Sequence, residues 1–206
     1  WEKEGAKILH VIDLDATISG SLKNREIVKK ILKEVKIPVE VGGGIRSVED
    51  VVSLVTAGAR WVILGTVAIE NPELVYRIVK TVTSKHVIIA LDSRKNIVLK
   101  NGWKKETSKS PQEILKFYEP LDLAAFLFTD VEVEGTMKGI NLKNVVNLVK
   151  STRTPIIYSG GIASLQDILK ILKTGVKGVV VGRALYEGCF TLKEAEEAVK
   201  NAFSKS

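Results

Sequence analysis

The most regular feature of the chain is a series of short apolar runs that are rich in Val and Ile. These runs are nearly continuous rather than alternating with polar residues, which is typical of strands that are covered on both faces of a sheet. The sequence therefore predicts buried strands at 8–12, 38–41, 61–64, 86–91, 124–128, 155–158 and 178–181.

Between these runs, apolar residues recur three and four positions apart, which is the period of a helix with one buried face. Such stripes lie at 28–35, 48–55, 142–149 and 165–172. Ser47 and Ser164 precede two of the stripes, and an Asp follows each Ser three residues later, a pattern related to the capping box that predicts a helix start. Alternating strands and helices imply parallel strands with right-handed crossovers. Two architectures then compete, an open doubly wound sheet and a closed (β/α)8 barrel.

An internal repeat favours the barrel. A shift of 117 residues places identical residues on one another without a gap. The matching pairs include Pro38 with Pro155, Gly43 with Gly160, Gly44 with Gly161, Gly65 with Gly182 and Asp13 with Asp130. This spacing corresponds to about four βα units, or half of an eightfold barrel. The predicted fold class is therefore α/β, a (β/α)8 TIM barrel built from two homologous half-barrels.

The predicted barrel is incomplete at its N-terminal end. Barrels of this class contain eight βα units in about 250 residues, whereas seven units are visible here. The chain begins with Trp1 rather than Met, and WEKEGAK is typical of a helix end that leads into a strand. We therefore expect the first strand and most of the first helix to be absent. No linker divides the chain, which predicts a single domain over 1–206.

Composition restricts the setting and the partners. Hydrophobic residues make up 45% of the chain and charged residues 27%, as in folded globular proteins. No apolar run reaches the roughly 18 residues that a membrane helix needs. One cysteine, Cys189, and two histidines argue against a disulfide framework and against a metal site, so we expect no metal, a buried Cys189 and a cytoplasmic location. The net charge of +7 suits an anionic ligand, while the spread-out lysines and the lack of an RNA-binding signature argue against nucleic acid.

Glycine pairs follow predicted strands at matching points of the two halves. Glycine lets the backbone approach a ligand, and the following helix start offers N–H groups to an anion. One such pair is weak evidence, because turns need glycine in any case. Two copies at half-barrel spacing predict a ligand with two phosphates, one bound on each side of the barrel mouth. The candidate residues are Gly43, Gly44, Gly65 and Thr66 in the first half and Gly160, Gly161, Gly182 and Arg183 in the second.

Carboxylates end several of the predicted strands, where the active site of a barrel lies. Asp92 is predicted to act as a general acid or base. Glu134, in the loop after the strand that ends at Asp130, suits a catalytic and a structural role equally, whereas Asp13 and Asp130 are predicted to bond loop backbone. Trp103 follows an Asn-Gly hairpin signal and suits either stacking on a ligand or fixing its loop. We expect His10 and His86 to be packing residues.

The chain resembles a family of histidine-pathway enzymes, the phosphoribosylformimino-5-aminoimidazole carboxamide ribotide isomerases. The resemblance is collinear over essentially the whole chain. It is carried by HVIDLD (10–15), VEVGGGIRSVED (39–50), IALDSR (89–94), NGW (101–103), TDVEVEGTMKGIN (129–141), SGGIASLQD (159–167) and VVVGRALYEGCFTL (179–192). The cyclase subunit of imidazole glycerol phosphate synthase shares the half-barrel repeat, but the IRS, NGW and GRALYEG strings are more similar to the isomerase.

The resemblance implies an Amadori rearrangement of an aminoaldose to an aminoketose, without metal or organic cofactor. In the family an Asp on the first strand is the base, which this chain does not contain. Asp92 and Thr129 match active-site positions, and Glu134 stands where the family usually has Asp, so either Asp92 or Glu134 suits the acid. Arg46 and Trp103 match positions that contact the substrate, and the glycine pairs match its two phosphate sites.

Other functions remain open at this stage. They are a dual-specificity isomerase that also accepts phosphoribosylanthranilate, the cyclase, and a non-catalytic phosphate-binding barrel. The expected partner is a small bisphosphorylated ribotide, with no nucleic acid and no membrane, and the expected state is a monomer.

Overall fold

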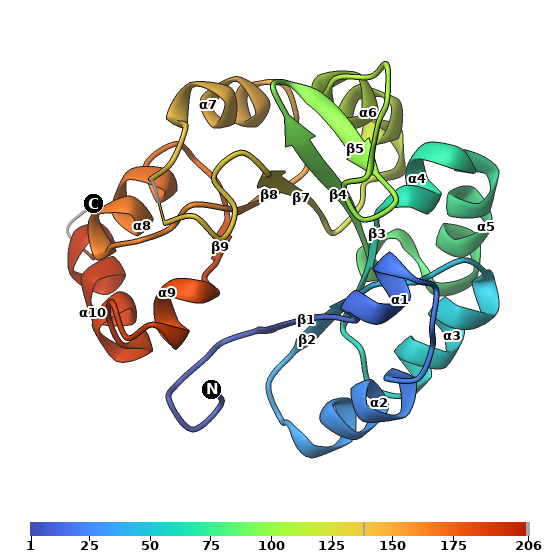
Figure 1. Cartoon of the computed structure of the whole chain (residues 1–206), viewed down its shortest axis with the longest axis horizontal. Helices are drawn as coiled ribbons and strands as arrows, with labels where there is room; N and C mark the ends of the chain where they lie inside the picture. The colour runs from blue at the N-terminus through green and yellow to red at the C-terminus, as the bar shows by residue number, and fades with distance from the viewer. Residues whose placement is uncertain (138, 205–206) are drawn as a thin grey trace.

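Strands and helices alternate along the computed structural model, which describes residues 1–137 and 139–204. Within those residues, seven parallel strands form the main sheet, and neighbours in the sheet are neighbours along the chain (Figure 1). They are β1 (Leu9–Ile12), β2 (Val39–Gly42), β3 (Trp61–Leu64), β4 (Val87–Arg94), β7 (Ala125–Asp130), β8 (Ile156–Ser159) and β9 (Gly178–Val180). All the predicted strands are thus confirmed.

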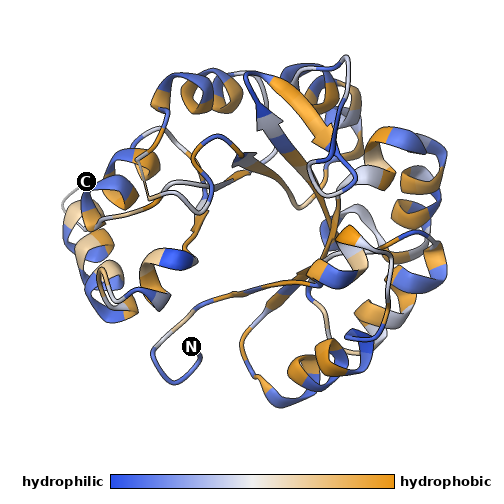
Figure 2. Ribbon diagram, in the orientation of Figure 1, coloured by the Kyte–Doolittle hydropathy of each residue, from blue (hydrophilic) through white to orange (hydrophobic). Residues whose placement is uncertain are grey.

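The helices form an outer ring around the strands (Figure 1). The longer ones are α2 (Arg25–Glu34), α3 (Val48–Thr56), α5 (Pro72–Val82), α6 (Pro111–Tyr118), α7 (Leu142–Lys150), α8 (Leu165–Leu172) and α10 (Leu192–Phe203). Short helices follow three of the strands, namely α1 (Leu14–Ile18), α4 (Thr66–Glu70) and α9 (Arg183–Tyr186), and single 3-10 turns are η1 (Ser84–His86) and η2 (Glu119–Leu121). The apolar stripes of the helices face the strands (Figure 2).

An inner apolar layer made almost entirely of strand residues distinguishes a barrel from an open doubly wound sheet, in which helices cover both faces. Residues that alternate along each strand point to opposite faces of the sheet. Outward residues such as Val39 and Val41 pack in the large cluster against the helices. Inward residues form a second cluster that contains Ile12 of β1, Leu127 of β7 and Val180 of β9. Because side chains from both ends of the strand order share this inner cluster, the sheet curls into a ring.

The ring is nearly closed. β1 and β9 lie at the two ends of the strand order, and no hydrogen-bonded pairing joins them within the described part of the chain. The barrel, rather than the open doubly wound sheet, is therefore the architecture of this chain (Figure 1).

The backbone repeats the half-barrel pattern that the sequence indicates. Gly43 and Gly160 have φ angles of 101° and 116°, a region that side chains rarely adopt. Gly65 and Gly182, which precede α4 and α9, share a second unusual conformation, with φ of −100° and −113° and ψ of −102° and −97°. Equivalent glycines of the two halves thus adopt equivalent backbone conformations.

A hairpin extends from β4 and is larger than the sequence predicts. Asn101-Gly102 does lie in a turn, between β5 (Ile97–Lys100) and β6 (Lys105–Glu106). In addition, β4 runs on to Arg94 and pairs antiparallel with β5 through a turn at Lys95 and Asn96, which have φ angles of 49° and 63°. Lysine at such a position is no turn signal, so this part was missed. The hairpin brings Trp103 to the carboxyl end of the barrel.

A membrane-spanning segment is not found among the described residues, since none of their helices combines the necessary length and apolar character.

The start of α3 depends on a reciprocal pair of hydrogen bonds, as predicted. The Ser47 hydroxyl accepts from the Asp50 backbone N–H at 3.1 Å, and the Asp50 carboxylate accepts from the backbone N–H of Ser47 at 3.1 Å. The same carboxylate accepts from the N–H of Arg46 at 3.0 Å. Ser164 also caps α8, since its hydroxyl accepts from the Asp167 backbone N–H at 3.2 Å, but here the Asp167 carboxylate accepts from the Ser164 hydroxyl at 2.9 Å and from the N–H of Ala163 at 3.2 Å.

Replacing the cap tests this reading. We expect Ser47→Ala to lower the free energy of unfolding by about 1 kcal/mol, because a backbone N–H loses its acceptor. Ser53→Ala, inside the same helix, is the control and should leave stability unchanged or slightly raised, since alanine is the better helix former. Denaturant unfolding measures both; equal losses in the two variants would contradict a capping role for Ser47.

Candidate active site

A cavity of about 890 Å³ opens at the carboxyl ends of the strands. The residues that line it extend from β1, at one end of the strand order, to α9, which follows β9 at the other end. All the residues that the sequence singled out as candidates line it: Gly43, Gly44, Arg46, Gly65, Thr66, Asp92, Trp103, Thr129, Glu134, Gly160, Gly161, Gly182 and Arg183. The structure therefore brings together residues that are up to 140 positions apart in the chain.

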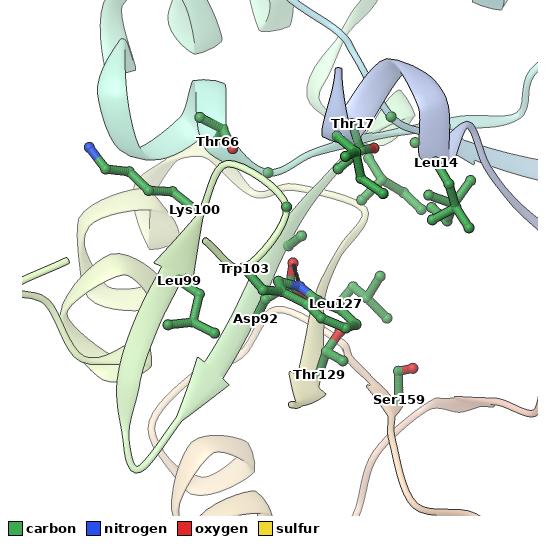
Figure 3. A pocket seen from close by; sticks show the side chains of 18 of the residues that line it. Leu14, Thr17, Thr66, Asp92, Leu99, Lys100, Trp103, Leu127, Thr129 and Ser159 are labelled. Atoms are coloured by element: carbon green, nitrogen blue, oxygen red, sulfur yellow. Dashed lines mark hydrogen bonds between the residues drawn. The ribbon is translucent and has the colours of Figure 1, made fainter. Parts of the chain in front are cut away.

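Asp92 lies near the end of β4, in the centre of the cavity (Figure 3). The indole N–H of Trp103 donates a hydrogen bond to its Oδ2 at 2.9 Å. Burial raises the pKa of Asp92, while the bonds from Trp103 and Thr129, and then the charge of His10, lower it; burial prevails. A carboxyl group in this state retains its proton at a higher pH than an exposed one.

Glu134 follows β7 and faces the same cavity. Its Oε2 accepts from the Ser159 hydroxyl at 3.2 Å. Burial again raises the pKa; the Ser159 bond lowers it, the Asp92 charge raises it and the His10 charge lowers it, with a net increase. The two carboxyl groups therefore interact, and each holds its proton more strongly than usual.

Asp13 and Asp130 bond to loop backbone, as predicted, and neither lines the cavity. Asp13 Oδ1 accepts from the N–H of Ala16 at 3.0 Å and caps α1. Asp130 Oδ1 accepts from the N–H of Glu132 at 3.2 Å. The shift of 117 residues places Asp13 on Asp130, so both side chains accept backbone N–H groups at equivalent points of the two halves.

In both halves the glycine after the first strand of the pair is tightly packed, whereas the glycine after the second strand has space beside it. A Cβ on Gly43 would lie 2.4 Å from the carbonyl oxygen of Asp13, and one on Gly160 would lie 2.7 Å from that of Asp130. A Cβ on Gly182 would meet nothing within 4 Å. The first pair of glycines is thus required by packing, whereas Gly182 leaves free space beside the backbone.

Positive side chains lie at both corners. The guanidinium of Arg46 extends toward Gly20, at which a Cβ would lie 2.8 Å from its Nη2. Arg183 donates from Nη1 to the carbonyl oxygen of Gly135 at 2.7 Å and pairs with Glu187 at 3.2 Å. Both arginines line the cavity, and each side of the mouth therefore carries a cation.

His10 corrects the sequence analysis. The predicted packing role is wrong, because its side chain lines the cavity, and its Nδ1 lies 2.5 Å from Oε1 of the buried Glu40. Neither residue was a candidate; the only signal in the sequence was a charged residue within the apolar run PVEV. His86 lies away from the cavity, with Nδ1 donating to the carbonyl oxygen of Arg60 at 2.8 Å.

Metal-ligand geometry is not found: no group of three or more His, Cys, Asp or Glu side chains in residues 1–137 and 139–204 is arranged to hold an ion.

Cys189, expected to be buried, is exposed, because it lies in the loop between α9 and α10. Carboxyl, hydroxyl, imidazole and cationic side chains line the cavity.

A ligand cavity at the carboxyl ends of a parallel α/β ring, with paired carboxyl groups at its centre, defines an α/β-barrel enzyme. The family model described as "Histidine biosynthesis protein" matches residues 1–191. The chain belongs to this family.

Curated relatives support this family assignment. The chain is 44% identical over 200 residues to a protein of Methanococcus maripaludis strain C7, covering 97% of this chain and 84% of the relative. It is 44% identical over 203 residues to one of Methanosarcina barkeri (97% and 83%) and 45% identical over 201 residues to one of Methanosarcina mazei (96% and 82%). Each of these is named 1-(5-phosphoribosyl)-5-((5-phosphoribosylamino)methylideneamino)imidazole-4-carboxamide isomerase.

The hydrogen bond from Trp103 yields a titration test. We expect Trp103→Phe to raise the pKa of Asp92 further, because the lost N–H donor stabilises the ionised form and burial is then less opposed. Carbon-13 NMR of the Asp92 carboxyl group measures the change. Trp1→Phe, which alters an exposed indole that does not line the cavity, should leave it unaffected; a fall in the pKa of Asp92 in Trp103→Phe would contradict the argument.

Proposed function

We propose that this chain catalyses the reaction named for its relatives, the Amadori isomerisation of a bisphosphorylated ribotide in histidine biosynthesis. The substrate is an aminoaldose and the product an aminoketose. The observation that carries this proposal is the position of two carboxyl groups, Asp92 and Glu134, whose pKa values burial raises, between two equivalent glycine corners in one cavity.

The first chemical step requires an acid. A proton delivered to the ring oxygen of the ribose opens the ring to a Schiff base. A base then takes the proton from C2, which gives an enolamine that collapses to the ketose; the family resemblance places this base, an Asp, on a first strand outside residues 1–206. A carboxyl group with a raised pKa suits the first step. We assign it to Asp92, which has the hydroxyl of Thr129 beside it, and place Glu134 as the neighbouring carboxyl group whose charge is coupled to that of Asp92.

The two corners bind the two phosphates. Backbone N–H groups near Gly43, Gly44, Gly65 and Thr66 serve one phosphate, and those near Gly160, Gly161, Gly182 and Arg183 serve the other. A molecule with one phosphate at each end would then extend across the mouth, with its reacting sugar over Asp92. Trp103, at the tip of the hairpin, is placed to contact the heterocycle.

Replacing the acid tests the proposal. We expect Asp92→Asn to lower kcat by about 10²–10⁴-fold, because the amide has no proton to deliver. Conversion of the aminoaldose to the aminoketose by the intact protein measures the rate. Asp122→Asn, at an exposed position directly after η2, should leave it unchanged. An unmodified protein that includes the first strand and still releases no aminoketose would overturn the function, whereas an active Asp92→Asn variant would remove only Asp92 from the mechanism.

Arg46 provides a separate test of substrate binding. We expect Arg46→Ala to raise KM by about 10–100-fold with a smaller effect on kcat, because a hydrogen bond to a charged group is worth about 1.5–3 kcal/mol. Steady-state kinetics separates the two parameters. Arg153→Ala, an exposed arginine after α7, is the matched control and should behave as the unmodified protein. An unchanged KM in Arg46→Ala would rule out its contact with the substrate.

A further inference from the structure

Glu40 is an acidic residue inside the barrel. It is 3% exposed and lies on β2 between Val39 and Val41, which both pack outward against the helices. Because successive residues of a strand face opposite sides, the Glu40 side chain points into the ring. An ionised carboxylate there requires a partner, since an unpaired buried charge is costly.

The partner comes from the neighbouring strand. His10 and Glu40 stand opposite each other in the β1–β2 ladder, and Nδ1 of His10 is 2.5 Å from Oε1 of Glu40. The imidazole also lines the cavity. Its second ring nitrogen, Nε2, makes no hydrogen bond with the described residues. Glu40 thus holds Nδ1 of His10, and Nε2 is available to a ligand.

The internal repeat supplies a comparison within the same molecule. The shift of 117 residues places His10 on Leu127 and Glu40 on Ile157. These two residues also stand opposite each other, in the β7–β8 ladder, and both belong to the inner apolar cluster. The same fold therefore packs with two aliphatic side chains at these positions. Packing alone does not call for a charged pair in the first half.

The charged groups facing the pair are those of the site. Asp92 of β4 and Glu134 after β7 both feel the charge of His10, as their pKa values reflect. From β3, Trp61 stands opposite Glu40 and is uncharged. The imidazole thus stands between a buried carboxylate on one side and the reacting centre on the other.

We propose that Glu40 is a positioning residue of the isomerase site, which fixes His10 with its proton on Nδ1 and directs Nε2 to the substrate. This inference rests on the proposed function. A carboxylate only accepts hydrogen bonds, so Nδ1 must carry the hydrogen. In the neutral ring, Nε2 then carries the lone pair and accepts from a hydroxyl of the sugar. Carboxylates behind catalytic or ligating histidines fix the ring tautomer in this way.

The tautomer can be measured without any turnover. The chain has two histidines, so nitrogen-15 spectra of the imidazole rings are simple, and His86→Gln identifies the signals of His10. With the ring titrated to its neutral form, we expect the proton of His10 on Nδ1 in the unmodified protein and in Glu40→Gln, whose amide oxygen also accepts. In Glu40→Ile, which copies the residue of the second half, we expect the Nε2–H tautomer to appear. A neutral His10 with its proton on Nε2 in the unmodified protein would overturn the proposal.

Kinetics tests whether Glu40 acts through His10. We expect Glu40→Ile to lower kcat/KM by about 10–100-fold, as is usual for a residue behind a ligating histidine, and Glu40→Gln to restore most of the activity. In a His10→Leu background, Glu40→Ile should cause no further loss, because the pair acts as one unit. The double variant reproduces the Leu127–Ile157 pair and is expected to fold. His86→Gln, remote from the cavity, should leave kcat/KM unchanged.

The outcomes separate this inference from the proposed function. If the unmodified protein does not convert the ribotide, the function fails, and the tautomer spectra still decide the role of Glu40. If the protein is active but the losses from His10→Leu and Glu40→Ile simply add, Glu40 acts independently of His10 and the inference is wrong.

Discussion

The alternation of side chains along the parallel strands of a curled sheet determines which residues face the helices and which form the interior and the cavity of the barrel. Outward residues join the helices, and inward residues must fill a ring that the side chains of all its strands share. Below the site, the ring is filled by apolar side chains that include Ile63, Ile88, Ala90 and Leu127. Above these side chains the inward positions become polar, at Asp92, Thr129 and Ser159. The site is therefore the upper layer of the core, and its rigidity and partial dryness follow from the apolar layer below.

This arrangement also explains the acid–base character of the cavity. Asp92 and Glu134 are withdrawn from water by the ring around them, which favours their protonated forms. Individual donors from Trp103, Thr129 and Ser159 oppose that effect without cancelling it. The balance between burial and a few named hydrogen bonds sets the pH range in which either group is an acid.

The features that could be predicted from the sequence are those encoded locally. The strands are visible in apolar runs, the start of α3 in Ser47 and Asp50, and the corners at Gly43 and Gly160 in the repeat. Curling of the sheet was also predictable, because a duplicated half suggests a ring. By contrast, the β4–β5 turn at Lys95 and Asn96 has no glycine to mark it. The roles of His10 and Glu40 depend on which face of a strand points inward and on which strands are neighbours, and neither is written in a short stretch of chain.

The two halves are alike at their corners and unlike between them. Gly43 matches Gly160 and Gly65 matches Gly182 in conformation, so the corners by themselves offer little to distinguish one end of a doubly anionic molecule from the other. The floor differs, with His10 and Glu40 on one side and Leu127 and Ile157 on the other. An elongated ligand with a phosphate at each end could therefore bind across the mouth in either orientation. The asymmetry of the residues beneath it, rather than the corners at the rim, then selects the orientation that leads to reaction.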